Sequence, residues 1–129
     1  MVNEWISWCQ TKWFPVMHHS LLPVLGYSKA TDSKTYSQQV SDAKSVAKEL
    51  DTHLHDRDWI VGTDTMTLAD IYVGTCMIFV FQTLFDKGTR TGMPNLAKWF
   101  DKFINNQHVK DNFGIIKPCE KAIKPDFTQ

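Results

Sequence analysis

The histidines and cysteines are the residues of this sequence whose chemistry includes metal binding and nucleophilic catalysis. His53 and His55 flank Leu54, and His18 and His19 are adjacent. A zinc site needs three or four ligands that converge on one ion. On a helix, residues two apart point about 200° away from each other and adjacent residues about 100°, so neither pair can chelate one ion. Because no third ligand is evident in the sequence, we expect no metal site.

The three cysteines, Cys9, Cys76 and Cys119, are widely spaced and form no CxxC motif. This pattern favours reduced thiols over a disulfide framework. Cys9 and Cys76 lie in apolar segments, which predicts unreactive core thiols, and Cys119 is therefore the cysteine to test for reactivity. Glycine-rich phosphate-binding loops are missing from the sequence as well. We therefore expect no catalytic residues, no cofactor-binding residues, no cofactor and no enzymatic activity.

Length and charge narrow the class of protein. The 129 residues fit a single domain spanning 1–129, and 14 basic side chains balance 14 acidic ones. A net charge of zero disfavours nucleic-acid binding through bulk electrostatics. The first 20 residues carry no signal peptide pattern, and the longest apolar stretch, 71–85, is too short to cross a bilayer. We expect a cytoplasmic protein that binds neither nucleic acid nor membranes directly.

Apolar residues recur every three or four positions along most of the chain, which is typical of α-helices. Such sets occupy residues 2–13, 16–25, 40–54 and 96–104. Pro15 has no backbone N–H, so we expect it to end or kink the first helix. The polar residues 27–37 predict a surface loop, a short helix is expected to end at Gly114, and a last one to start at Pro118. Alternating strand patterns are missing, so the sequence predicts an all-α helical bundle.

The stretch GTDTMTLADIYVG, residues 62–74, marks the start of the central helix of this bundle. Thr67 and Asp70 have the spacing of a capping box, in which each side chain bonds the backbone N–H of the other residue. Met66 and Ile71 are placed to form a hydrophobic staple across the same helix start. The residues that follow are apolar on every side as far as residue 85, which predicts a helix buried by its neighbours.

The sequence Thr67-Leu68-Ala69-Asp70-Ile71, with Val61-Gly62 before it and Pro94-Asn95-Leu96 after it, resembles the C-terminal helical domain of the glutathione S-transferase superfamily. Transferases of this superfamily bind glutathione mainly through an N-terminal thioredoxin-like domain, which supplies the Ser, Tyr or Cys that activates the thiol. Only two residues precede the helical part here. The resemblance therefore implies a helical bundle with the thioredoxin-like domain absent, and it does not support a transferase reaction.

Within the superfamily, the chain is most similar to the gamma-subunit family of eukaryotic translation elongation factor 1. Residues 22–26 (LPVLG), 94–100 (PNLAKWF) and the ending from 104 to 121 carry this similarity. It implies a non-catalytic scaffold domain whose partners are other protein subunits of the elongation factor 1 complex. Two alternatives stay open: a relic or fragment of a glutathione transferase, and an assembly module of an aminoacyl-tRNA synthetase complex. Superfamily members also pair through these helices, which implies a homodimer as a further form.

Trp8 is the residue that we expect at an interaction surface. Trp5 and Trp13 belong to the apolar side of the first helix, whereas Trp8 lies about 60–100° away from it on an ideal helix. Tryptophan is enriched in the residues that dominate binding energy at protein interfaces. An exposed Trp8 would therefore mark a contact with a partner or with another domain.

Overall fold

The computed structural model describes residues 2–25 and 32–123, except for the side chains of Pro23 and Leu25. Its elements are the helices α1 (Val2–Trp8), α2 (Phe14–Leu25), α3 (Ser33–His53), α4 (Leu68–Thr83), α5 (Lys87–Gly92), α6 (Pro94–Asn105) and α7 (Gln107–Phe113), and the π-helical turn η1 (Cys9–Trp13). Strands do not occur in these described residues, which confirms the prediction of an all-α bundle.

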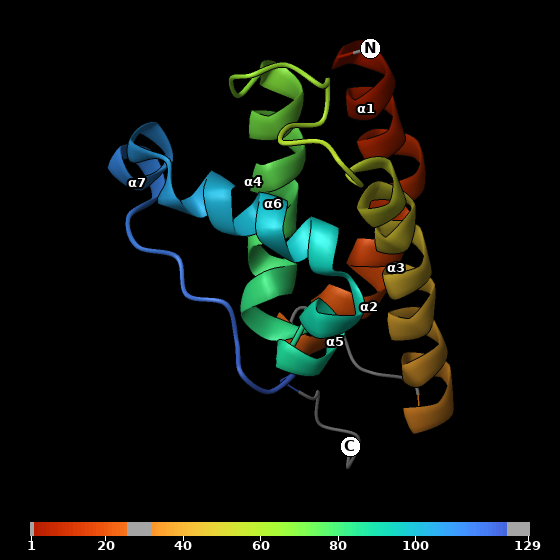
Figure 1. Ribbon diagram of the computed structural model, residues 1–129. Helices are drawn as coiled ribbons and strands as arrows, with labels where there is room; N and C mark the ends of the chain where they lie inside the picture. Colours follow the sequence, from red (N-terminus) through yellow and green to blue (C-terminus); the bar gives the residue numbers. More distant parts are fainter. Residues whose placement is uncertain (1, 26–31, 124–129) are drawn as a thin grey trace.

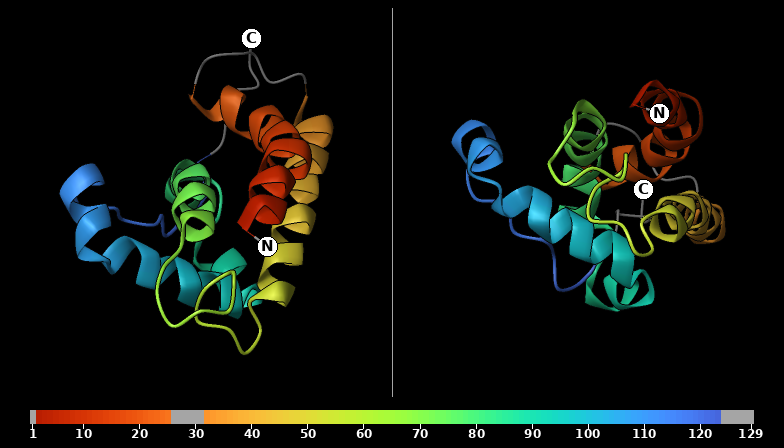
Figure 2. Two further views of the ribbon diagram at one scale, coloured as in Figure 1. Left: turned by 90° about the horizontal axis from the view of Figure 1, so that it is seen from above. Right: turned by 45° about the horizontal axis from the view of Figure 1, so that its top comes forward.

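Helix α4 lies in the middle of the bundle (Figure 1). α1 and α2 pack along one side of it, α6 crosses its other side, and α3 lies against both α2 and α6. Seen from above in Figure 2, the α1–α2 and α3 helices form one flank and the α6–α7 pair the other. The segment after α7 returns to the end of α4, where the N–H groups of Cys119 and Ile123 donate to the carbonyls of Phe81 and Thr83 at 2.9 and 2.7 Å.

α4 and α6 meet at the centre of a core that η1, α2 and α3 complete. Val73, Met77 and Val80 of α4 are fully buried, and Phe81 stacks on Phe100 of α6 with 4.0 Å between ring centroids. The expectation that α4 is buried on every side is wrong for one face, because Leu68 and Phe79 are each 58% exposed. In the described part of the chain, helices long and apolar enough to span a membrane do not occur.

The two central helices cross closely at Gly74. A Cβ atom at this position would lie 2.6 Å from the ring of Phe103, which is itself fully buried. Such a separation is too short for two carbon atoms, since their optimal distance is about 3.5–4.0 Å. Glycine is therefore required here by the approach of the Phe103 ring and not by backbone conformation.

Of the two outcomes expected at Pro15, an end or a kink, the helix does not end there. Helical structure continues from α1 through η1 into α2, and within η1 the N–H of Phe14 donates to the carbonyl of Cys9, five residues earlier. In a regular α-helix the proline ring would clash with the carbonyl of Thr11. The π-turn stands directly before this position, so the chain changes its pitch where a regular turn would be strained and remains helical.

Three other boundaries differ from the sequence prediction. α3 begins at Ser33, inside the expected loop, because Asp32 accepts from the N–H of Thr35 at 2.7 Å and caps the helix. α5 was not expected; Asp86 caps it in the same way through Thr89. The helix expected from Pro118 does not form among the described residues 118–123. The sequence also predicts that Gly26 ends the helix of residues 16–25, and this residue lies outside the described ones.

Candidate functional site

Asp70 is the centre of a buried hydrogen-bond cluster. Its carboxylate, 0% exposed, accepts from the backbone N–H of Thr67 and of Ile60, both at 2.9 Å. It also accepts from the indole N–H of Trp99 at 2.8 Å and from the Thr67 hydroxyl at 3.2 Å. Buried charges are tolerated when donors surround them in this way, and the N-terminus of α4 adds favourable dipole charge. The cluster connects the 60–66 loop, α4 and α6.

The residues expected at the start of α4 lie together there. Thr67 precedes the helix with extended backbone and forms a capping box with Asp70. Met66 is half-buried against the core, whereas Ile71 is 42% exposed. The hydrophobic staple between them stays a prediction. Local sequence patterns do not mark Ile60 and Trp99 as partners of Asp70, because these residues reach it only through the tertiary fold.

Trp8 was expected at an exposed interaction surface, and the structure places it differently. It is half-buried, and its ring lies 5.3 Å from that of Trp5 and stacks on that of Trp13 at 6.3 Å. Residues five apart on a regular α-helix point about 140° away from each other. The π-turn brings Trp8 and Trp13 to the same side instead, so the position inferred from an ideal helix was wrong. A role for Trp8 in binding stays a prediction, now of a half-buried residue.

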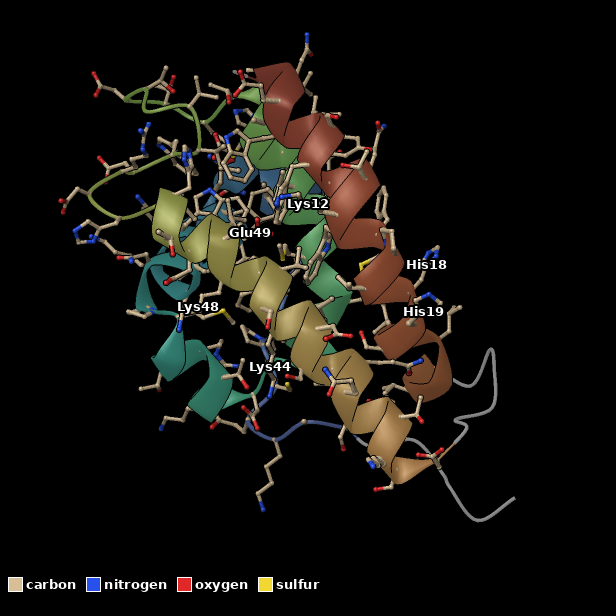
Figure 3. All side chains as sticks on the ribbon, turned by 90° about the vertical axis from the view of Figure 1, so that its right-hand side faces the viewer. Lys12, His18, His19, Lys44, Lys48 and Glu49 are labelled. Carbon is tan, nitrogen blue, oxygen red and sulfur yellow. The ribbon has the colours of Figure 1, made fainter. Side chains whose placement is uncertain are left out.

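The histidines do not form a metal site. Nε2 of His53 lies 2.6 Å from the carbonyl of Ile60, so this nitrogen donates, and the ring packs against Trp5. His55 is exposed and contacts Asp56. His18 and His19 point outward from α2, as Figure 3 shows. In the described residues no group of three His, Cys, Asp or Glu side chains is placed to hold a metal ion.

Cys9 and Cys76 contact each other, which the sequence did not indicate. The Cys9 thiol is fully buried, and its hydrogen bond to Cys76 raises its pKa well above the usual range and lowers the pKa of Cys76. Burial raises the pKa of Cys119. Cys76 is also more accessible than Cys9, since it is partly exposed. The expectations of unreactive thiols at Cys9 and Cys76, and of Cys119 as the cysteine to test, stay predictions.

Two kinds of surface surround the bundle. Leu68, Ile71 and Phe79 lie on one side of α4 and are exposed; we call them the α4 apolar face. The surface of η1, α2 and α3 is polar, with Lys12 bonded to Glu49 at 3.1 Å (Figure 3). A mainly apolar hollow of ≈ 340 Å³ lies between α3 and the end of the described chain, lined in part by Tyr36, Val40, Leu84 and Ile123.

The helix order, the capped central helix and the close crossing of α4 and α6 define a known class of domain. A model of the glutathione S-transferase C-terminal domain family matches residues 5–107. The chain belongs to this family.

Among individual proteins, the chain is similar to elongation factor 1-gamma. It is 32% identical to the protein of Artemia salina over 94% of the chain and 28% identical to that of Danio rerio over 97%. The chain spans about 28% of the length of each of these relatives.

Solved structures with the same fold include the GST-like domain of elongation factor 1-gamma from Saccharomyces cerevisiae. It has a TM-score of 0.85 at 18% identity, over 97% of this chain and 56% of that one. Glutathione S-transferase III in its apo form has a TM-score of 0.70 at 17% identity, over 88% and 53% of the two chains. At these identities the likeness concerns the fold alone.

Proposed function

We propose that this chain is a non-catalytic scaffold domain that binds protein partners in a translation elongation factor 1 complex, in the manner of a gamma subunit. The observation that carries the proposal is the similarity to elongation factor 1-gamma over 94% of the chain. The buried positions of Asp70 and Asp51 support it, since these carboxylates accept from backbone N–H groups. The cytoplasm is the compartment that such a role implies.

The α4 apolar face is the surface that we assign to partner binding. Phe79 and Leu68 are each 58% exposed on a helix whose other sides are buried, and Ile71 lies between them in the sequence. Exposed apolar side chains grouped on one helix face are typical of protein–protein contacts. Trp8 stays a second candidate, because Trp is common at the centres of interfaces.

The test is capture of purified elongation factor 1 subunits by the tagged 129-residue chain. We expect the wild-type chain to retain at least one subunit. Phe79→Asp places a charge on the α4 apolar face and is expected to reduce the retained amount at least about tenfold, since a desolvated charge costs more than about 1.4 kcal/mol. His18→Asp changes an exposed residue of α2 and serves as the matched control.

Failure of the wild-type chain to retain any elongation factor 1 subunit would contradict the proposal. Retention of synthetase-complex proteins instead would favour the assembly-module alternative. Equal retention by the Phe79→Asp chain would leave the scaffold role standing and remove the α4 apolar face from it. Light scattering of the free chain distinguishes a monomer from the homodimer that the superfamily resemblance implies.

A relic of a glutathione transferase is the second candidate. The shared fold with glutathione S-transferase III and the mainly apolar hollow beside Tyr36 and Leu84 favour it. Turnover of a chlorinated aromatic electrophile with glutathione by the isolated chain, above the uncatalysed rate, would support this candidate. We expect no such turnover.

A further inference from the structure

Cys9 and Cys76 face each other across two packed elements, η1 and α4. Two side-chain hydrogen bonds hold η1 and α4 in the alignment that places Cys9 opposite Cys76. Gln10 donates to the hydroxyl of Tyr72 at 3.2 Å, and the indole of Trp13 donates to the carbonyl of Cys76 at 3.4 Å. The first bond involves the residue after Cys9 and the residue one turn before Cys76. The two thiols are therefore held opposite each other, and a hydrogen bond joins them.

The accessibility of the two cysteines differs in a way that suits stepwise oxidation. Cys9 is fully buried, and Cys76 is partly exposed at the edge of the core. A small oxidant from solvent therefore reaches Cys76 first. Cys9 then stands in contact with it as the resolving thiol, an arrangement found in redox-sensing cysteines.

We propose that Cys9 and Cys76 form a reversible disulfide when a peroxide oxidises the protein, and that this bond fastens the π-turn η1 to α4. The Cys76 thiol gives up its proton, its thiolate attacks one peroxide oxygen, the O–O bond breaks, and Cys76 becomes a sulfenic acid while the leaving hydroxide takes up that proton as water. The Cys9 sulfur then attacks the Cys76 sulfur, the S–O bond breaks, and the hydroxide leaves with the Cys9 proton as a second water. Two thiols are oxidised and one hydrogen peroxide is reduced to two waters.

The π-turn at Cys9 is the local backbone feature next to this bond. A disulfide needs two Cα atoms about 4.4–6.8 Å apart with side chains that point toward each other. Cys9 opens the π-turn, and its carbonyl holds the N–H of Phe14 five residues on. π-Turns occur as local distortions inside α-helices, often at functional sites. The irregular turn that Cys9 opens is therefore the part of the backbone that would adjust to the bond.

Cys119 does not compete for Cys76. Its backbone N–H donates to the carbonyl of Phe81, and its carbonyl accepts from Arg90 at 2.6 Å. Phe81 lies more than one turn along α4 from Cys76, because five residues of α-helix span about 7.5 Å. The tail therefore holds Cys119 at the far end of α4. The inference is independent of the proposed scaffold role and of its partners.

Peptide mapping of the wild-type chain tests the proposal directly. The three cysteines fall in separate tryptic peptides, residues 1–12, 58–87 and 111–121. The reduced chain is treated with hydrogen peroxide, quenched in acid, alkylated while unfolded and digested. We expect peptides 1–12 and 58–87 to appear joined, with a mass two hydrogens below their sum. Dithiothreitol is expected to separate the two peptides. It is also expected to return the fluorescence of Trp8 and Trp13, which lie beside the two cysteines, to its value before peroxide treatment.

Two variants sharpen the result. Cys119→Ser is the matched control and is expected to give the same joined peptides in the same yield. Cys9→Ser is expected to abolish them and to leave Cys76 as sulfenic or sulfinic acid; circular dichroism checks that this variant still folds. Oxidation of Cys76 in the wild-type chain without a joined peptide would overturn the proposal. Joining of Cys76 to Cys119, or joining between two chains, would overturn it as well.

Discussion

Among single residues, two buried aspartates accept hydrogen bonds from backbone and side-chain N–H groups inside this bundle. Asp70 accepts four hydrogen bonds at the start of α4, and Asp51 of α3 accepts from the N–H of Leu96 at 2.8 Å. Leu96 lies in the first turn of α6, whose N–H groups have no partner within the helix. Both side chains therefore satisfy backbone donors that the core would otherwise leave unpaired.

Replacement of Asp70 by alanine tests this role. Asp70→Ala leaves the N–H of Ile60 and the indole of Trp99 buried without an acceptor, and each such donor costs about 1–3 kcal/mol. We expect the free energy of unfolding to fall by about 3–5 kcal/mol in urea titrations, within the range of severe single substitutions. Asp64→Ala, at an exposed carboxylate of the same loop, is the control and is expected to stay within about 0.5 kcal/mol. Equal stability of the two variants would refute the assignment of Asp70.

At the scale of elements, two irregularities decide how the helices fit together. The π-turn η1 stacks Trp8 on Trp13 and places Cys9 against α4. Gly74 lets the Phe103 ring of α6 approach the backbone of α4. Neither feature follows from the apolar pattern, since that pattern is read with a fixed period of 3.6 residues and does not measure the space between helices.

Gly74→Ala tests the close approach of α6 to α4. The added methyl would lie 2.6 Å from Phe103, and overpacking of a core costs about 1–3 kcal/mol, more than the helix-propensity gain of up to about 1 kcal/mol. We expect a lower midpoint in thermal and urea unfolding. Gly92→Ala, where nothing lies within 4 Å of an added Cβ, is the matched control and is expected to be neutral or stabilising. A neutral Gly74→Ala chain would show that Phe103 moves aside without cost.

At the scale of the whole molecule, the segment after α7 closes the bundle at the far end of α4. Arg90 of α5 donates to the carbonyls of Phe85 and Cys119 at 2.8 and 2.6 Å, and thereby joins the end of α4, α5 and the returning tail. The backbone N–H groups of Cys119 and Ile123 bond to α4 beside it. Arg90 is thus a charged side chain that contacts three segments at once.

Loss of Arg90 is expected to release the tail while the bundle stays folded. In Arg90→Ala, hydrogen exchange of the Cys119 and Ile123 amides should become faster, about 5–30-fold for the loss of 1–2 kcal/mol of local stability. The amides of Val80 and Phe81 in α4 should keep their protection. Lys87→Ala, at an exposed residue of the same helix, should change neither set. Unchanged exchange at Cys119 in the Arg90 variant would mean that the backbone bonds hold the tail alone.

The helical class, the central helix, its Thr67–Asp70 start and the apolar side of α6 can be predicted from the sequence, because they depend on periodicity and on contacts within four residues. Packing between helices is what joins Ile60 and Trp99 to Asp70, brings Cys9 to Cys76 and leaves one face of α4 exposed. Each of these pairs residues far apart in the chain, or depends on which neighbour covers which side of a helix. Local sequence patterns predict neither these distant contacts nor the side of a helix that each neighbour covers, because both depend on how the helices pack.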